Sequence, residues 1–187
     1  NDRLDALYNA ASLGYPLSRI FIAPLPKYFY INERLRAGQM RDRPKGVLFA
    51  PTHRWRNNIP PLTKLLEDEN LVRKFENLNV RIFHSMHPDT KEAPLYRGIN
   101  KFLGNWDDID IVVTDYSSIG NDFINSGGSK LIYFIPDREV FESNQGVGLF
   151  FDNSLALGSV CTEVDSLVAN LLDFLECSEF GDVVELL

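Results

Sequence analysis

The sequence predicts an α/β protein with a parallel β-sheet that helices cover on both faces. Short runs rich in β-branched residues alternate with segments whose apolar residues recur at helical spacing. The run 109–113 is nearly continuous in apolar residues, as is typical of a strand buried on both faces. The chain has 187 residues, 44% of them apolar, which is enough for one sizeable core. We therefore expect a single Rossmann-like domain over residues 1–187.

The first 45 residues precede the regular alternation. Apolar spacing predicts a helix over 4–13, which Gly14 ends. A short strand is expected over 19–25 and a short helix over 31–37. The polar and basic stretch 39–45 is the best candidate for a linker.

Strands and helices alternate regularly from residue 46 onward. The predicted strands are 46–50, 80–84, 109–113 and 130–135. The predicted helices are one or two over 60–78, and one each over 96–103, 117–125 and 165–176. Right-handed crossovers place the carboxyl ends of all the strands on one edge of the sheet, where ligands bind in such folds.

Charge and cysteine usage narrow the choice of function. The formal charge of −7 argues against general nucleic-acid binding, which needs many Lys and Arg residues. Cys161 and Cys177 fit no metal-binding spacing, so we expect reduced thiols in a cytosolic protein. The acidic run 107–110 is expected to be a solvated turn, with Mg²⁺ binding as a weaker alternative.

Several familiar signatures are missing from the sequence. It contains no Gly-x-Gly-x-x-Gly and no Gly-Lys-Ser or Gly-Lys-Thr, so neither NAD binding nor P-loop chemistry is expected. No apolar run approaches the roughly 20 residues of a membrane-spanning helix. Because the chain starts at Asn1 without Met or a signal-peptide pattern, we expect a fragment of a longer protein.

Polar side chains follow four predicted strands, in the segments 51–54, 85–88, 115–118 and 136–139. These segments contain hydroxyls and cations of the kind that hold phosphate. Because the carboxyl ends of parallel strands share one edge, these segments are expected to lie close together. The sequence therefore predicts a site for a phosphate-bearing ligand at this edge.

Ser117 and Ser118 stand where the helix 117–125 is predicted to begin. A lone serine there is most often only a helix cap. Two successive hydroxyls with Gly120 close behind fit an anion site better. Asp115 would repel phosphate, so we expect it to fix the loop through backbone N–H groups or to accept a ligand hydroxyl. Asp122 is expected to stabilise the first turn of the helix.

His84 and His87 have no third partner at metal-ligand spacing, so no metal site is expected. His84 ends an apolar strand and is expected to be packed. His87 precedes Pro88 in an extended turn, where it can donate to a diphosphate or act as an acid toward a leaving phosphate. Thr52 and Arg54 at a strand end suit phosphate contacts, with a merely solvated arginine as the equal alternative.

Four segments occur in an order that resembles a known family. They are Val-Leu-Phe-Ala-Pro-Thr-His-Arg at 47–54, His-Pro at 87–88, Asp-Ile-Val-Val-Thr-Asp-Tyr-Ser-Ser at 110–118 with Asp-Phe at 122–123, and Lys-Leu-Ile-Tyr-Phe at 130–134. Together they resemble the CDP-glycerol:poly(glycerophosphate) glycerophosphotransferase family, the teichoic-acid primases and polymerases and their capsule-polymer relatives. The resemblance implies that this chain is the C-terminal, nucleotide-binding half of a GT-B fold, whose active site lies between two Rossmann-like halves.

The resemblance also implies roles for the residues at the sheet edge. The residues implied in donor binding are Thr52, Arg54, Asp115, Tyr116, Ser117, Ser118, Asn144 and Gln145. His87 is the catalytic candidate and would hold the CDP diphosphate together with Ser117 and Ser118. Asp115 and Tyr116 would shape the loop.

Two departures from the family pattern limit what the resemblance implies. The family's Trp-His-Gly segment, whose histidine is expected to be the catalytic base, belongs to the N-terminal half and is absent here. This chain alone is therefore expected to be inactive. The family also tends to carry an Arg-Gly pair where this chain reads Asn-Gln-Gly at 144–146, which leaves the donor open between CDP-glycerol and a relative such as CDP-ribitol.

We expect the donor-binding domain of a glycerophosphotransferase. In the complete enzyme, an acceptor hydroxyl would attack the β-phosphate of a CDP-alcohol and extend a teichoic-acid or capsule-type polymer. The expected partners are CDP-glycerol or a related CDP-alcohol and the polymer acceptor, without a cofactor, a metal or nucleic acid. The expected location is the cytoplasmic face of a bacterial membrane, as a peripheral protein. The alternatives are a GT-B glycosyltransferase that uses a sugar nucleotide, and a non-catalytic binding module of the same fold.

Overall fold

The computed structural model describes residues 14–19, 44–54, 59–85, 98–145 and 156–176. The chain divides into two compact units, Asn1–Gln39 and Met40–Leu187. Within the first, the described residues contain the 3₁₀ helix η1 (Leu17–Arg19). The helices predicted over 4–13 and 31–37 and most of the strand predicted over 19–25 lie outside the described residues. The single domain over 1–187 stays a prediction.

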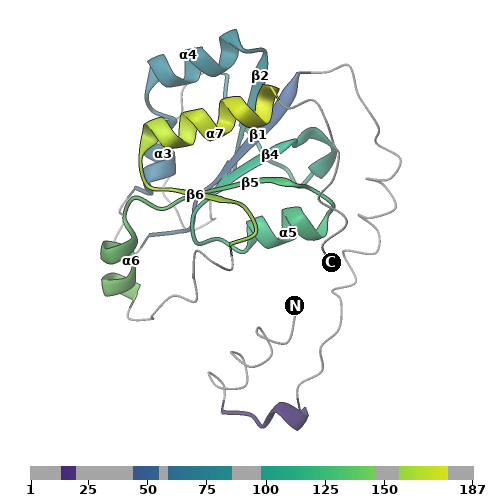
Figure 1. Ribbon diagram of the computed structural model, residues 1–187, viewed down its shortest axis with the longest axis vertical. Helices are drawn as coiled ribbons and strands as arrows, with labels where there is room; N and C mark the ends of the chain where they lie inside the picture. The colour runs from purple at the N-terminus through teal and green to yellow at the C-terminus, as the bar shows by residue number, and fades with distance from the viewer. Residues whose placement is uncertain (1–13, 20–43, 55–58, 86–97, 146–155, 177–187) are drawn as a thin grey trace. The chain divides into compact units, whose positions relative to one another are not determined.

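The second unit contains a parallel sheet in the strand order β3-β2-β1-β4-β5-β6 (Figure 1). Its strands are β1 (Lys45–Ala50), β2 (Val80–His84), β3 (Asn100–Lys101), β4 (Ile111–Thr114), β5 (Lys130–Phe134) and β6 (Ser159–Cys161). Every neighbouring pair is parallel. This is the strand order of a Rossmann fold, which reverses direction between β1 and β4. The predicted α/β class is confirmed.

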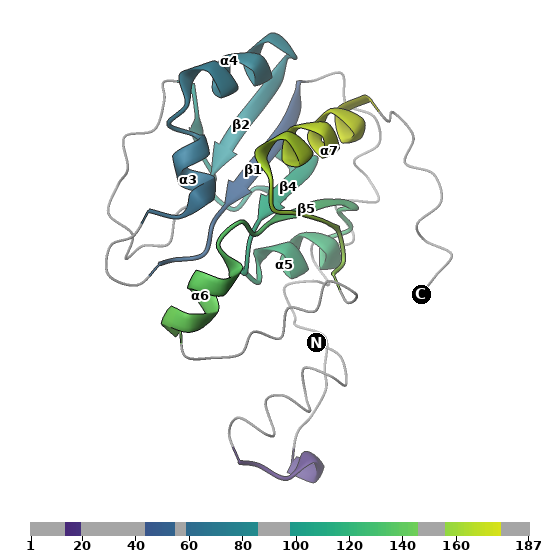
Figure 2. The ribbon, with the colours of Figure 1, turned by 60° about the vertical axis from the view of Figure 1, so that its left-hand side comes forward.

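Helices cover both faces of the sheet (Figures 1 and 2). The helices are α3 (Pro61–Leu65), α4 (Glu69–Asn77), α5 (Ile119–Asn125), α6 (Arg138–Gln145) and α7 (Val164–Glu176). Helices α3, α4 and α7 pack on one face through Leu62, Phe75 and Leu171, and α5 packs on the other through Phe123. None of the helices in the described part of the chain has the length and apolarity that crossing a bilayer requires.

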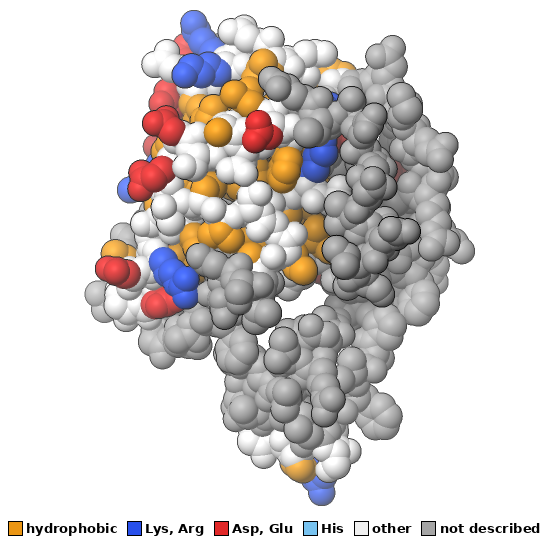
Figure 3. All heavy atoms as spheres, viewed as in Figure 1, with side chains coloured by type: hydrophobic (Ala, Val, Ile, Leu, Met, Phe, Trp, Pro, Cys, Tyr) orange, Lys and Arg blue, Asp and Glu red, His pale blue; other side chains and the backbone are white. Residues whose placement is uncertain are grey.

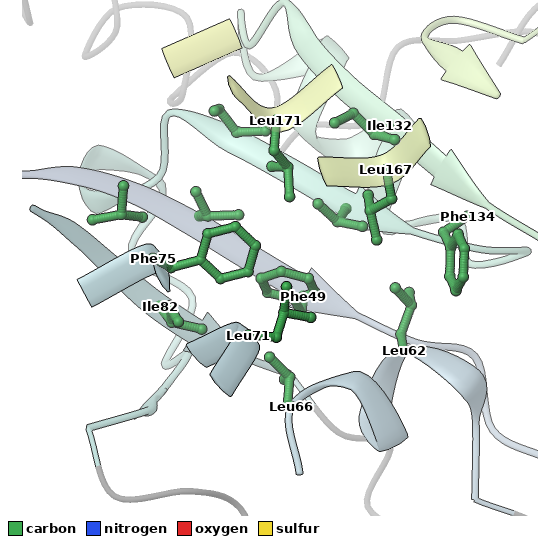
Figure 4. Close-up of a cluster of buried hydrophobic side chains, with 14 of the residues drawn as sticks. Phe49, Leu62, Leu66, Leu71, Phe75, Ile82, Ile132, Phe134, Leu167 and Leu171 are labelled. Atoms are coloured by element: carbon green, nitrogen blue, oxygen red, sulfur yellow. The ribbon is translucent and has the colours of Figure 1, made fainter. Parts of the chain in front are cut away.

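Side chains on the two faces of β1 belong to two separate hydrophobic clusters, because successive side chains of a strand point to opposite faces. Phe49 points into the larger cluster, beside Phe75 of α4 at a ring-centroid distance of 6.2 Å (Figure 4). Leu48 points into the other cluster. Trp106 is partly buried and packs against this second cluster, next to the rings of Phe102 and Phe123.

Two lysines at the amino edge of the sheet stabilise the end of α7. The Lys45 ammonium donates to the carbonyl of Leu175, and the Lys130 ammonium donates to the carbonyl of Phe174 at 2.5 Å. Carbonyls in the last turn of a helix lack helical partners and carry its negative dipole end, so cations are favourable there. These contacts fasten α7 to the starts of β1 and β5.

A close backbone approach at the same edge requires glycine at position 46. Its N–H donates to Asp110 Oδ2 at 2.7 Å, and its carbonyl accepts from the N–H of Asp110 at 2.8 Å. A Cβ added to Gly46 would lie 1.8 Å from the carbonyl oxygen of Asp108. The loop before β4 therefore packs directly on the backbone of β1.

The helix predicted over 96–103 is wrong for the residues that the structure describes. Asn100 and Lys101 form β3, which pairs with the end of β2. Gly98 has φ of +104°, which interrupts a helix, and the Asn100 side chain donates to the carbonyl of Ile82 at 3.1 Å. Helix α6 and the short strand β6 were not predicted. The other elements predicted from residue 46 onward are present, with shifted ends.

Candidate functional site

The loops that follow β1 and β4 leave the sheet side by side at its carboxyl edge. Ala50 and Thr114, the last residues of these strands, are paired in register, and the Thr114 hydroxyl donates to the carbonyl of Ala50 at 2.6 Å. The strand order reverses between these two strands. In open α/β sheets, ligands bind in the crevice outside such a reversal point. Residues 51–54 and 115–118 therefore border the best candidate site of the fold.

Asp115 joins these two loops. Its side chain is 1% exposed. Its Oδ1 accepts from the backbone N–H of Thr52 at 2.8 Å and from that of Tyr116 at 2.6 Å. Its Oδ2 accepts from Arg54 Nη2 at 2.8 Å. Asp115 thus has the geometry of a residue that fixes the loop through backbone N–H groups, one of the two roles considered for it.

Arg54 extends this connection to a third loop. Its Nε and Nη2 donate to the carboxylate of Asp137 at 3.0 and 3.3 Å, and Asp137 lies between β5 and α6. Its Nη1 donates to the carbonyl of Thr52 at 2.9 Å. Together with the bond to Asp115, the guanidinium uses four of its five N–H donors on protein acceptors. Arg54 is only 6% exposed, so the alternative of a solvated surface arginine is wrong.

Two stacked rings pack beside the guanidinium. The rings of Tyr116 and Phe141 are nearly parallel, with centroids 3.9 Å apart. Arg54 Cζ lies 5.2 Å from the Tyr116 centroid and 4.5 Å from that of Phe141. The Tyr116 hydroxyl donates to Asp137 Oδ1 at 3.3 Å. Burial, followed by the negative charge of Asp137, raises the pKa of Tyr116 well above its usual value, so the phenol keeps its proton at neutral pH.

The two predicted serines differ in their contacts. Ser117 Oγ accepts from the N–H of Ile119 at 3.3 Å and so caps the start of α5. Ser118, the residue before α5, is exposed, and its hydroxyl makes no capping bond. The hydroxyl of Thr52 is buried and meets no partner within the described residues. Of the hydroxyls in these two loops, those of Thr52 and Ser118 are therefore the better candidates to bind a ligand.

Three of the predicted site residues have no described contact with this group. Asn144 is exposed near the end of α6, and Gln145 is the last residue of that helix. His87 lies outside the described residues, so its role stays a prediction. Contacts of all these residues with a substrate likewise stay predictions.

His84 is packed, as expected. It is 3% exposed, and burial lowers its pKa to about 4, so the imidazole is neutral at pH 7. No group of three or more His, Cys, Asp or Glu residues forms a metal site in the part of the chain that the structure describes. Asp108 and Asp110 bind the protein instead, to Arg81 at 2.9 Å and to the N–H of Gly46.

Asp137 and Phe141 were not among the predicted site residues. Asp137 belongs to the segment 136–139 that follows a predicted strand, so its position carried a signal. Phe141 is brought to the site by α6, which the sequence did not predict, because Phe141 is the helix's one buried residue among 138–144. Its two apolar residues, Val140 and Phe141, are adjacent and so give no helical spacing to detect.

Comparison with known proteins agrees with this architecture. A family model described as CDP-Glycerol:Poly(glycerophosphate) glycerophosphotransferase matches residues 31–182. The chain is similar to the solved structure of the wall teichoic acid polymerase TagF, with 18% identity and a TM-score of 0.62 over 91% of this chain and 47% of that one. A histidine-to-asparagine variant of that polymerase gives 17% identity and a TM-score of 0.64, over 94% of this chain and 50% of that one.

The same variant soaked with CDPG gives 18% identity and a TM-score of 0.63, over 91% of this chain and 46% of that one. The chain therefore spans about half the length of these solved structures. No curated protein sequence matches it significantly.

Proposed function

Because this chain belongs to the CDP-glycerol:poly(glycerophosphate) glycerophosphotransferase family, we propose that it binds the nucleotide-linked donor of such a transferase. The donor is CDP-glycerol or a related CDP-alcohol. The observation that carries the proposal is the meeting of loops 51–54 and 115–118 at the point where the strand order reverses. In a family of transferases, this edge is the natural place for the nucleotide.

The donor diphosphate binds to hydroxyls and N–H groups of these loops. Ser118 and Thr52 supply hydroxyls, Ser117 supports the start of α5, and His87 supplies a further donor. Arg54 already binds two carboxylates, so it contributes by holding the loops in place more than by direct phosphate contact. Donors fixed in advance around a phosphate stabilise charge that develops during transfer.

In the complete enzyme, an acceptor hydroxyl attacks the β-phosphorus of the CDP-alcohol. The new O–P bond forms as the bond to the bridging oxygen breaks, CMP leaves, and the acceptor proton passes to a base outside this chain. The acceptor is a growing teichoic-acid or capsule-type polymer. The enzyme works at the cytoplasmic face of a bacterial membrane, as a peripheral protein.

Calorimetric titration with CDP-glycerol tests the proposal, with UDP-glucose as the competing donor class. We expect CDP-glycerol to bind and UDP-glucose to bind more weakly. Ser118→Ala and His87→Ala should each weaken CDP-glycerol binding by about threefold or more, because each removes a hydrogen bond to a charged group. Ser129→Ala is the matched control, since Ser129 is also an exposed serine but precedes β5 at the opposite edge.

The competing outcomes separate the alternatives. Tighter binding of UDP-glucose would favour the sugar-nucleotide glycosyltransferase. If neither nucleotide binds, the chain is a module without this donor site. If the Ser118 and His87 variants both bind CDP-glycerol as tightly as the parent does, the phosphate-site assignment is wrong.

A further inference from the structure

We infer that Asp137 and Phe141 are positioning residues for the donor site, acting through Arg54 and Tyr116. The inference rests on the proposed function, because it names what holds the loop 115–118 in its binding geometry. Neither residue follows β1 or β4 directly. Both come from the connection after β5, which the structure brings to the same edge.

The first step is the ionic connection from Asp137 through Arg54 to Asp115. Arg54 lies between two carboxylates. The side chain of Asp115 is buried, at 1% exposed, whereas that of Asp137 is 22% exposed and lies nearer to solvent. Asp137 accepts two of the four hydrogen bonds that Arg54 donates. Without Asp137 the guanidinium keeps one carboxylate and one carbonyl, and its plane is no longer fixed from both sides.

The second step is the packing of Phe141 on Tyr116. The backbone N–H of Tyr116 donates to Asp115, while its ring stacks on Phe141 and its hydroxyl donates to Asp137. The same residue is therefore held at its backbone and along its side chain. The centroid of the Phe141 ring also lies 4.5 Å from Arg54 Cζ, a cation–π contact that helps to hold the guanidinium in place.

Phe141 packs on the site and not in the core of the sheet. Phe141 is buried, yet it belongs to neither hydrophobic cluster of the sheet. Among residues 138–144 of α6, all except Phe141 are exposed or partly exposed, and all of these except Val140 are polar; Figure 3 shows acidic and basic side chains over this helix. The packing of α6 is therefore directed to Arg54 and Tyr116. Small displacements of binding groups strongly reduce their contribution, so loss of this support should reach Ser117 and Ser118.

The experiment is titration of the full 187-residue chain with CDP-glycerol, alongside thermal unfolding of each variant. Asp137→Ala and Phe141→Leu should each weaken binding about fivefold or more, and Asp137→Asn, which keeps one acceptor, should lose less. In the Asp137→Ala background, Ser118→Ala should cost clearly less affinity than it does in the parent, because its hydroxyl is already misplaced.

Two controls match these variants. Glu142→Ala also removes a carboxylate, one in α6 that accepts from Arg138 Nε at 2.9 Å. This change should leave the affinity for CDP-glycerol unchanged. Phe75→Leu shortens a buried aromatic residue of the larger cluster, so it should lower thermal stability without weakening binding.

The outcomes are distinct. If the parent binds CDP-glycerol while Asp137→Ala and Phe141→Leu bind equally well, the positioning roles are wrong and the proposed function stands. If affinity merely follows thermal stability, so that Phe75→Leu loses as much as Phe141→Leu, the roles are structural and the inference is overturned. If the parent does not bind, the proposed function itself fails, and the inference fails with it.

Discussion

Replacing Arg54 by Met removes the cation that joins the loops after β1, β4 and β5. Methionine keeps an unbranched side chain beside the rings of Tyr116 and Phe141, so the main loss is electrostatic. Asp115, 1% exposed, keeps its two backbone donors but loses its charged partner. Asp137 is 22% exposed, and water compensates much of its loss.

The expected cost follows from this burial. Removing one partner of a buried ion pair costs about 3–5 kcal/mol, because the remaining charge stays buried. With Asp137 largely compensated by water, we expect Arg54→Met to lower the free energy of unfolding by about 3 kcal/mol at pH 7. For a unit of this size, that corresponds to a fall in Tm of roughly 10 °C.

Urea unfolding followed by circular dichroism measures this loss. Arg73→Met is the control, since the Arg73–Glu69 pair of α4 is exposed and its removal should cost less than about 0.5 kcal/mol. Adding Asp115→Asn to Arg54→Met should restore part of the stability, because the buried side chain at position 115 then carries no unpaired charge. If Arg54→Met costs no more than Arg73→Met, the buried connection does not support the fold as described.

Three further changes test other parts of the structure. Lys130→Met removes the ammonium that binds the carbonyl of Phe174, and urea unfolding should show a loss of about 1 kcal/mol; no loss would mean that this contact does not stabilise α7. Gly46→Ala should cost more than about 2 kcal/mol in the same assay, because its Cβ would lie 1.8 Å from the carbonyl of Asp108; stability within about 0.5 kcal/mol of the parent would contradict the close approach. His84 accepts a proton below its ordinary pKa of 6.5 when unfolded, but only below about 4 when folded, so the parent should lose stability as the pH falls from 6.5 to 4, by up to about 3 kcal/mol. His84→Phe should lack this part of the pH dependence, and an unchanged pH profile would exclude His84 as its source.

The sheet was predictable because its central strands bury both faces. Strands β1, β4 and β5 are nearly continuous apolar runs, and in β2 buried residues alternate with partly buried ones. The predicted positions of these four strands agree with the structure, apart from small shifts of their ends. The edge strands β3 and β6 have two and three residues. Whether such a short segment forms a strand depends on the neighbouring strand with which it pairs, because two or three residues are too few to show an alternation of apolar and polar residues.

The sheet edge at which the candidate site lies was predictable, but the hydrogen-bond partners of the residues in the site were not. Parallel topology alone brings the segments after β1 and β4 together. The sequence cannot tell which anion an arginine meets, and Arg54 meets Asp115 and Asp137 in the structure. That choice depends on α6 and the turn before it, which the buried Phe141 and the carboxylate of Asp137 attach to the site.

The donor is proposed to bind where the loops after β1 and β4 meet. Backbone amide shifts of the ¹⁵N-labelled chain, recorded during titration with CDP-glycerol, test it most directly. We expect the largest changes at Thr52 and over 116–119, with little change at Gly46 and Lys130 on the opposite edge. Changes gathered at that opposite edge, or no changes at saturating CDP-glycerol, would contradict it.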